Sequence, residues 1–517
     1  MCCPHVCRVN AIAAGPTFKN VMKKLFIILG AILMATTPAM AEKALRVGVT
    51  SLPVLLGTPF GNLVVPALLP ALAIYDPLVK FDDKGDVVPA LATSWEMTSP
   101  TVWRFKLRTG VSFSNGEPFT AEAAASAVNY LASDAGLLEV VAQLVSDVTK
   151  ATAIDATTLD IETDAPNVLL PRRLAGVRIP APGHWKKLGR QEFSRKPVGT
   201  GPFMVKEWGA SKLVLVANPT SWRRPLLDRI DLLEVPDLNA RVQALRTGAV
   251  DVAFDVGPED RATIESAGGR LLVRRTGRIQ TVTFVSNKPS PVADVRVRQA
   301  LNYAVNKQSI VDVLLGGTTS PATQGAVPQS FGFDPSLTSY PYDPERARAM
   351  LKSAGYGNGF DMLLSFPPGI MAADEAYYQQ VASDLRAVGV RVEIETSTFA
   401  QHTSRIRTGG WPGLGFGMDF SNMPPLDALW PIRVHSCLWS APWHCRPEWT
   451  PLMRAAETAT SIEERLKLTR QLLKLYHDEP SGIFLWEMPG LDGVARRVVN
   501  YTPGFGTLNF DTIDIAP

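Results

Sequence analysis

Residues and motifs that common catalytic sites need are scarce in this sequence. Histidine occurs six times among 517 residues, and the five that follow His5 include no pair at the spacing of metal ligands on a helix. The phosphate-binding loop G-x-x-x-x-G-K-[ST], the zinc-protease motif H-E-x-x-H and the nucleophile elbow G-x-S-x-G are missing. These absences favour a binding protein over an enzyme, with no catalytic residues and no cofactor.

Positive charge is also lacking once the first 41 residues are set aside. The chain has 52 Lys and Arg against 49 Asp and Glu, and residues 1–41 hold four of the basic residues and no acidic one. The remaining 476 residues therefore carry a net charge of about −1, with no block of Lys or Arg. A chain of this kind has no electrostatic footprint for nucleic acid or anionic lipid. Its length predicts at least two domains.

After the first seven residues cysteine is nearly absent. Only Cys437 and Cys445 occur in the rest of the chain. Two cysteines in an exported chain favour a disulfide, which would stabilise the fold by roughly 2.5 kcal/mol through loop entropy. The alternative is a zinc site that adds His435 and His444. The C-x7-C spacing is longer than that of structural zinc sites, so the disulfide is the favoured interpretation and no metal ligand is assigned.

The start of the chain has the pattern of a secretory signal peptide. Met22-Lys23-Lys24 precedes the apolar run Leu25–Ala35, and small residues follow at the expected cleavage point. We expect residues 22–41 to be the signal peptide, residues 1–21 to be a misannotated N-terminal extension, and the mature chain to begin at Glu42. The apolar run is too short to span a bilayer, and no cysteine follows the cleavage point to carry a lipid. The predicted location is therefore the periplasm of a Gram-negative bacterium.

Local patterns predict alternating strands and helices. A strand is expected at 102–107, and a strand at 230–235, a helix at 239–247 and a strand at 250–256 form a βαβ unit with a parallel strand pair. Helices are expected after Asp294, Asp343 and Ser461, which are N-cap residues followed by apolar residues at helical spacing. These elements indicate an α/β fold.

Several longer segments resemble the family 5 extracellular solute-binding proteins of ABC importers, the group that binds peptides, dipeptides, opines and nickel. The strongest match is PALATSWE at 89–96, continued by FKLRTGVSFSNGEPFTA at 105–121. Further matches, in the family's order, are GTGPF at 199–203, NPTSW at 218–222, RQALNYAVN at 298–306, YDPERA at 342–347 and AGY at 354–356.

The resemblance implies a two-lobed α/β clamshell of the type II periplasmic-binding-protein class. Lobe I would cover 42–283 and 487–517, with an inserted subdomain at about 80–197, and lobe II would cover 284–486. Two strand connections would form a hinge. Closure around a solute excludes water and strengthens each polar contact to it.

The resemblance also implies ligand-binding residues. The segment GFGMDF at 415–420 looks like the family's GW-x-x-DY, whose Asp pairs with the ligand's α-ammonium in peptide binders. Asp419 matches that Asp, and Phe416 and Phe420 match the flanking aromatic residues; the alternative is that Asp419 caps a turn. Arg433 and His435 are candidates for meeting a ligand carboxylate. The chain departs from the family's D-x-P continuation, because SNMPP follows at 421–425.

Two sets near this segment stay open. Arg405 is a further candidate for a ligand carboxylate. The tryptophans at 430, 439, 443 and 449 surround the two cysteines, and they suit a cleft lining and a packed core equally.

The function that the resemblance implies is capture of a small solute, an oligopeptide or amino-acid-like molecule, and its delivery to a permease–ATPase complex in the inner membrane. The protein would act as a monomer and perform no reaction. One alternative is a binder of nickel or another metal chelate on the same scaffold. A second, less favoured alternative is a secreted hydrolase.

Overall fold

This computed structural model describes residues 42–54, 57–63, 65–370, 373–505 and 508–516. The predicted signal peptide and N-terminal extension lie outside the described residues. Within these ranges no helix is both long and apolar enough to cross a membrane. The residues from Lys43 onward form one compact unit.

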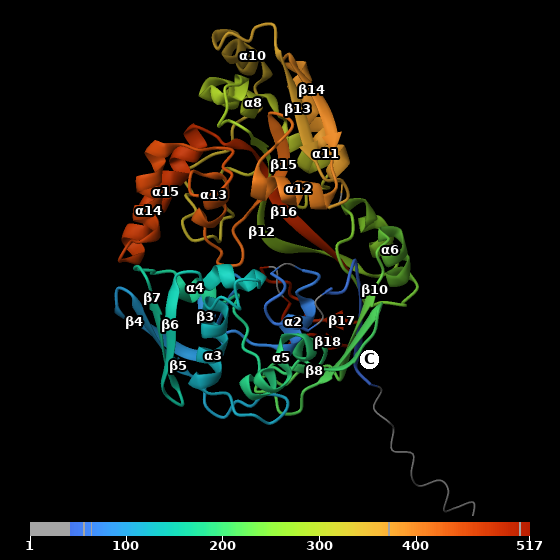
Figure 1. The fold of residues 1–517 in the computed structure, drawn as a ribbon. Helices are drawn as coiled ribbons and strands as arrows, with labels where there is room; N and C mark the ends of the chain where they lie inside the picture. The colour runs from blue at the N-terminus through green and yellow to red at the C-terminus, as the bar shows by residue number, and fades with distance from the viewer. Residues whose placement is uncertain (1–41, 55–56, 64, 371–372, 506–507, 517) are drawn as a thin grey trace, which may run out of the picture. The chain divides into compact units, whose positions relative to one another are not determined.

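A ten-stranded mixed sheet organises this unit (Figure 1). Two strands in its middle, β12 (Arg270–Phe284) and β16 (Gly482–Val494), are long and antiparallel to each other. On one side of them lie β15 (Gly415–Ser421), β13 (Phe360–Phe366) and β14 (Val390–Thr396). On the other side lie β11 (Val252–Ala253), β1 (Ala44–Val49), β10 (Arg229–Glu234), β9 (Lys212–Ala217) and β8 (Phe203–Trp208).

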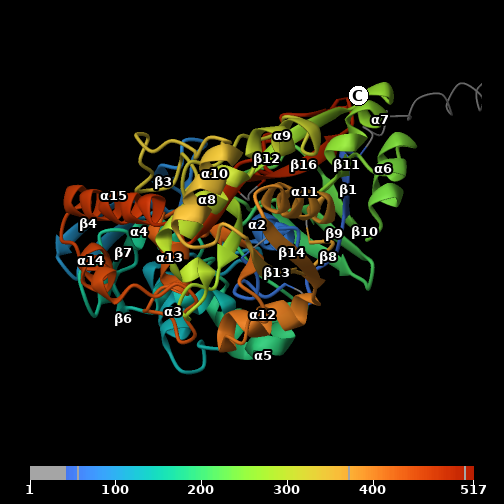
Figure 2. The ribbon, with the colours of Figure 1, turned by 90° about the horizontal axis from the view of Figure 1, so that it is seen from above.

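We call β12 and β16 the hinge strands, the described residues outside them lobe I, and the residues between them lobe II. Figures 1 and 2 both show the two hinge strands side by side. Pairing between β12 and β16 shifts register between Arg275 and Ile279, and β15 pairs with β12 from Arg278 onward. The irregularity therefore lies where β12 passes from the lobe I part of the sheet to the lobe II part. The exact lobe boundaries stay a prediction.

Lobe I contains a second, antiparallel sheet of four strands, which lies within the predicted inserted subdomain. Its order is β4 (Ala92–Ser99), β5 (Val102–Leu107), β7 (Thr158–Thr163) and β6 (Val148–Asp155). The strand predicted at 102–107 is confirmed as β5. The short pairs are β2 (Val79–Phe81) with β3 (Val87–Pro89) and β17 (Val498–Val499) with β18 (Asp514–Ile515). The helices of lobe I are α2 (Leu69–Ile74), α3 (Ala121–Ala132), α4 (Leu170–Leu174), α5 (Pro182–Arg195), α6 (Leu238–Arg246) and α7 (Arg261–Ser266).

Lobe II packs its own apolar core between its strands and helices. Its helices are α8 (Val295–Ala304), α9 (Lys307–Val313), α10 (Pro344–Ser353), α11 (Asp374–Ala387), α12 (Phe399–Thr408), α13 (Leu429–His435), α14 (Thr450–Glu457) and α15 (Ile462–Asp478). The main apolar cluster includes Val297, Leu301, Val381 and Leu385, which are fully buried. The main apolar clusters of lobe I are distinct from this one.

Three predicted helix starts are confirmed by their caps. The Asp294 side chain accepts a hydrogen bond from the N–H of Arg296 at the start of α8. Asp343 caps α10 and Ser461 caps α15 in the same way. A side-chain cap satisfies an N–H group that has no partner inside the helix, and it is worth about 1 kcal/mol.

The predicted βαβ unit is only partly correct. Its two strands, β10 and β11, are parallel and α6 connects them, but they are not neighbours. β1 lies between them and pairs in parallel with both. β11 is also shorter than expected, spanning Val252–Ala253 alone. Local patterns could not show that a strand from about 180 residues earlier in the chain, Ala44–Val49, is inserted here.

Candidate functional site

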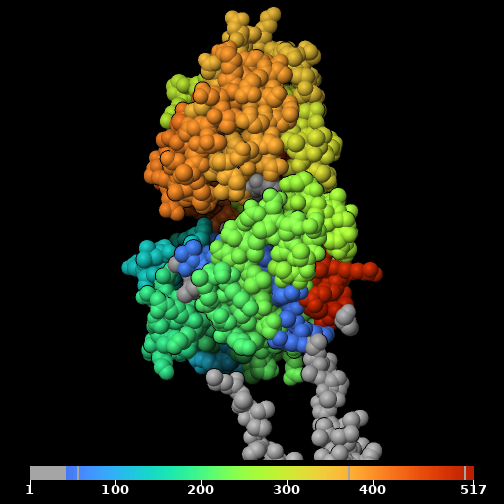
Figure 3. All heavy atoms as spheres, turned by 90° about the vertical axis from the view of Figure 1, so that its right-hand side faces the viewer, coloured from blue at the N-terminus to red at the C-terminus, as the bar shows by residue number. Residues whose placement is uncertain are grey.

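A cavity of about 990 Å³ lies between the lobes and against the hinge strands. Its volume falls in the range of small-molecule sites, roughly 300–1,000 Å³. Figure 3 shows an indentation between the orange residues of lobe II and the teal and green residues of lobe I. All three parts of the unit supply lining residues. Lobe I contributes Trp222 and Arg223, the hinge strands contribute Arg278 and Trp486, and lobe II contributes Tyr377 and Trp430.

One face of β12 forms the back of the cavity. Arg274, Thr276, Arg278 and Gln280 all line it. They are every second residue, and successive side chains of a strand point to opposite faces. A solute in the cavity therefore meets the hinge itself, so its contacts can be coupled to the angle between the lobes.

The lining is amphipathic and carries more positive than negative charge. Six basic residues line the cavity against three acidic ones, Asp76, Asp255 and Glu259. Aromatic residues from both lobes and the hinge strands lie between them. This arrangement suits a small molecule with an apolar part and at least one anionic group.

Asp76 is already fully engaged on the lobe I wall. Its Oδ2 accepts hydrogen bonds from Thr200 Oγ1 at 2.8 Å and from Trp222 Nε1 at 2.9 Å. Its Oδ1 accepts from Arg223 Nε at 3.1 Å, and Arg223 also forms an ion pair with Asp511. The cluster fixes Trp222 and Arg223 on the wall and satisfies both oxygens of Asp76.

Arg274 is the centre of a buried cluster at the hinge. It forms ion pairs with Asp492 of β16 and with Asp255 of lobe I, and it stacks 4.1 Å above the Phe254 ring. Burial opposes its charge, but the two aspartates outweigh burial, so the pKa of Arg274 is raised. A Cβ on Gly490 would lie 2.6 Å from the guanidinium carbon. Glycine at this position is what lets the arginine cross β16.

Asp419, the predicted partner of a ligand ammonium, forms a two-pronged ion pair with Arg278. Both nitrogen–oxygen distances are 2.7 Å, and each side chain is 24% exposed. Arg278 lines the cavity, whereas Asp419 does not. Burial lowers the pKa of Arg278, but the charge and hydrogen bonds of Asp419 raise it by more, so the pKa of Arg278 lies above its usual value. Contact between Asp419 and a ligand stays a prediction, and it requires Arg278 to move or to share the carboxylate.

The two phenylalanines that flank Asp419 are core residues of lobe II. Phe416 is fully buried and its ring lies 3.5 Å from that of Trp411, while Phe420 is 1% exposed and stacks on His435 at 4.7 Å. His435 is also fully buried, and burial lowers its pKa to about 3, so the ring is neutral. None of Phe416, Phe420 and His435 lines the cavity. Their predicted ligand contact remains untested and has no support from this lining.

The predicted arginine candidates lie elsewhere on lobe II. Arg433 forms an ion pair with Glu457, and its side chain is 54% exposed. Arg405 forms an ion pair with Glu395. Neither lines the cavity, so their role as carboxylate partners also stays a prediction.

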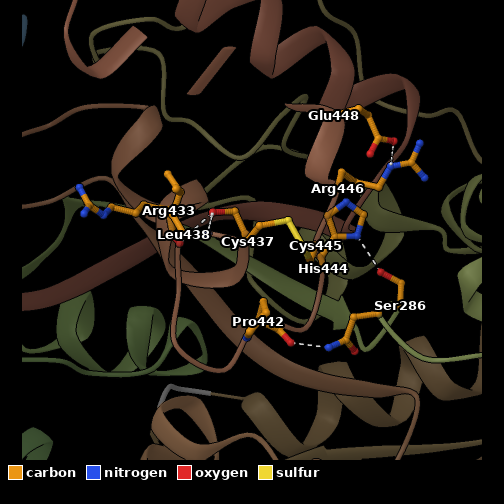
Figure 4. The surroundings of a disulfide bond; sticks show 11 residues. Ser286, Arg433, Cys437, Leu438, Pro442, His444, Cys445, Arg446 and Glu448 are labelled. Carbon is orange, nitrogen blue, oxygen red and sulfur yellow. Dashed lines mark hydrogen bonds and ion pairs between the residues drawn. A yellow bond between two sulfur atoms is a disulfide. The ribbon is translucent and has the colours of Figure 1, made fainter. Parts of the chain in front are cut away.

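Cys437 and Cys445 form the predicted disulfide, with an S–S distance of 2.05 Å (Figure 4). The loop that it closes is attached to the chain that leaves β12, because His444 Nδ1 and Ser286 Oγ lie 2.7 Å apart in a hydrogen bond. With both sulfurs bonded to each other, neither cysteine is left as a thiolate ligand for zinc. Of the nearby tryptophans, Trp443 belongs to the core and Trp430 lines the cavity.

Arg172 of α4 bridges the lobes beside the cavity. Its Nε donates to the carbonyl oxygen of Pro425 and its Nη2 to that of Leu426, both at 3.1 Å, and both acceptors belong to lobe II. The same Nη2 donates to Gly85 O of lobe I at 2.9 Å. The guanidinium also lies 4.9 Å from the Phe81 ring of lobe I. Through the first two contacts Arg172 joins lobe I to lobe II.

Several lining residues were missed because the resemblance pointed to the 415–420 segment. The polar side chains at every second position from Arg274 to Gln280 were a readable signal for a strand face that lines a polar site. Trp486 gave no such signal, because it follows three apolar residues and resembles a core residue in sequence.

A model of the family described as bacterial extracellular solute-binding proteins, family 5 middle, matches residues 86–436. Among curated proteins, the glutathione-binding protein GsiB of Shigella boydii is 28% identical over 393 residues, which is 74% of each chain. Heme-binding protein A of Haemophilus influenzae is 27% identical over 464 residues, 83% of this chain and 84% of that one.

Among solved structures, HbpA2 from Haemophilus parasuis matches with a TM-score of 0.79 and 21% identity, over 92% of this chain and 100% of that one. The match confirms the two-lobed α/β clamshell fold that the resemblance implied. The two curated relatives are named for the solutes that they bind, glutathione and heme.

Proposed function

This chain belongs to the bacterial extracellular solute-binding proteins of family 5, and from this we propose that it captures a small peptide-like or amino-acid-like solute between its lobes. It delivers that solute to the permease–ATPase complex of an ABC importer. The export signal expected at residues 22–41 and the disulfide both agree with work in the periplasm, because disulfides persist in oxidising compartments.

The observation that carries the proposal is the composition of the cavity wall. Lobe I, lobe II and the hinge strands each contribute side chains, so a bound solute gains its full set of contacts only when the lobes are together. The solute then binds the closed form more strongly than the open form. This difference in binding free energy is what shifts the protein toward the closed form. The closed form is what an importer can distinguish from the empty protein.

The lining narrows the class of solute. Tryptophan and tyrosine side chains provide apolar contact, and the excess of basic over acidic residues favours a solute with an anionic group. Two of the relatives are named for glutathione and heme, and both of these molecules carry carboxylates beside less polar parts. A metal chelate with carboxylate arms has the same chemistry and belongs in the same screen.

Isothermal titration calorimetry tests this proposal. The mature chain from Glu42 onward is titrated with dipeptides, tripeptides, glutathione, hemin and nickel chelates. A matched pair of variants separates the cavity from the rest of lobe II: Trp430→Ala removes a lining ring, and Trp439→Ala removes a ring that does not line it.

We expect one solute class to bind with one-to-one stoichiometry, and Trp430→Ala to weaken that binding while Trp439→Ala leaves it unchanged. Equal loss in both variants would mean that the cavity is not the binding site. Failure of every solute class to bind would count against the proposal as a whole.

A further inference from the structure

Arg178 is a cavity-lining arginine that is buried without a counter-charge. It lies in lobe I between α4 and α5, and its side chain is 5% exposed. Its backbone is held in place by an isolated antiparallel bridge to Pro77 and by a hydrogen bond of 3.1 Å from the N–H of Ile179 to Asp76 O. The guanidinium is therefore part of a fixed wall of the cavity.

Its hydrogen bonds account for only part of its donors. Nη1 donates to the carbonyl oxygen of Gly176 at 3.1 Å. Across the described ranges, no carboxylate forms an ion pair with Arg178, and Nε and Nη2 have no protein acceptor. Asp76, which is close in the fold, is saturated by Arg223, Trp222 and Thr200.

The other arginines of the lining are compensated. Arg223, Arg274 and Arg278 each meet at least one aspartate. Arg241 donates to four main-chain carbonyl oxygens. Against this pattern, Arg178 with its single carbonyl partner is an exception that packing alone does not explain.

The chain keeps this cation charged. Burial lowers the pKa of Arg178 to about 10, which still leaves the guanidinium protonated at neutral pH. Arg178 is 5% exposed and has no ion-pair partner, and withdrawing a charge this far from water costs free energy in the ligand-free state. An anion that enters the cavity recovers that cost, so it binds more strongly than it would to a compensated or solvated arginine.

We propose that Arg178 receives a carboxylate of the transported solute, and that the solute is therefore an organic acid with an apolar part. This inference rests on the proposed function, since it concerns the ligand of the same cavity. Nε and Nη2 form one edge of the guanidinium, and that edge matches the two oxygens of a carboxylate in a two-pronged contact. The apolar part would lie against cavity rings such as Trp222 and Trp430.

A first test needs no ligand. Arg178→Met keeps most of the side-chain length and removes the charge. Arg104→Met is the control, because Arg104 of β5 pairs with Asp160 of β7 and does not line the cavity. Since the variant removes an uncompensated buried cation, the ligand-free Arg178→Met chain should unfold at the same temperature as the wild type or higher. A clearly lower unfolding temperature than that of Arg104→Met would make Arg178 a structural residue and overturn the inference.

The second test uses matched probes. Glutathione, alanyl-phenylalanine and small aromatic acids are each titrated beside the corresponding amide. We expect acids but not amides to bind the wild type, Arg178→Met to lose about 30-fold or more in affinity for the acids, and Arg178→Lys to lose less. Arg104→Met should bind like the wild type.

The outcomes separate the two claims. Amides that bind the wild type as well as the acids do, or acids that bind Arg178→Met undiminished, overturn the role of Arg178 while the solute-binding function stands. If neither acids nor amides bind the wild type, the proposed function fails and this inference fails with it.

Discussion

Replacing Arg172 with methionine should weaken solute binding although Arg172 does not line the cavity. The change removes two hydrogen bonds from lobe I to main-chain oxygens of lobe II, those to Pro425 and Leu426. Each hydrogen bond contributes about 1–1.5 kcal/mol net, and the contact of the guanidinium with the Phe331 ring of lobe II adds about 0.5–1 kcal/mol. The closed form should therefore lose about 2.5–4 kcal/mol, or roughly 70- to 1,000-fold in apparent affinity.

Two measurements on the same samples test this value. Calorimetry gives the affinity of the wild type, Arg172→Met and the control Arg104→Met for one identified solute. Small-angle X-ray scattering compares the radius of gyration with and without that solute. The variant should need far more solute to reach the compact form and should still reach it at saturation. If its affinity equals that of the wild type, the bridge contributes nothing to closure and the reasoning is refuted.

Four further outcomes are expected. Asp419→Asn should weaken binding of an ammonium-bearing solute by about 2–5 kcal/mol in calorimetry. It should also lower the unfolding temperature, because Arg278 loses its ion-pair partner. Unchanged affinity would mean that Asp419 serves only as the structural partner of Arg278. Cys437→Ser should cost about 2.5 kcal/mol of unfolding free energy in urea, and a cost near zero would mean that the disulfide does not constrain the unfolded chain. Burial raises the pKa of the Glu487 carboxyl from 4.5 to about 7. Because this group ionises at lower pH in the unfolded state than in the folded state, the free energy of unfolding should fall as pH rises from about 5 to 7. Glu487→Gln should flatten that fall, and identical pH profiles for the variant and the wild type would contradict the shift. N-terminal sequencing of exported protein should begin at Glu42, and a sequence that begins at residue 1 would end the signal-peptide prediction.

Local features were predicted well because their physics is local. The caps of α8, α10 and α15 involve residues two or three positions apart, and strand β5 alternates within six residues. The disulfide joins cysteines eight positions apart. Each of these could be read from a short stretch of sequence.

Features that depend on distant partners were not accessible. β1 inserts between β10 and β11, and only the assembled sheet shows it. The ion pair of Asp419 joins residues 141 positions apart, so a local motif offered a ligand as partner where the structure has Arg278. Likewise, nothing near Arg178 in sequence shows that Asp76 is already saturated by other residues.

One part of the site hypothesis could have been refined from the sequence. If 415–421 is a strand, Phe416 and Phe420 share one face and Asp419 lies on the other. The structure has this arrangement: the two rings pack into the core of lobe II, and Asp419 pairs with Arg278. An aspartate flanked by aromatic residues in a strand is therefore not an aspartate inside an aromatic cage.

Native mass spectrometry of the mature chain, purified from the periplasm without denaturation, tests the central claim most directly. We expect a species heavier than the polypeptide by the mass of one small organic acid, and reversion to the bare polypeptide mass after denaturation and refolding. A single species at the bare polypeptide mass, unchanged after incubation with a small-molecule extract of periplasm, would contradict the claim that this chain is a solute-binding protein.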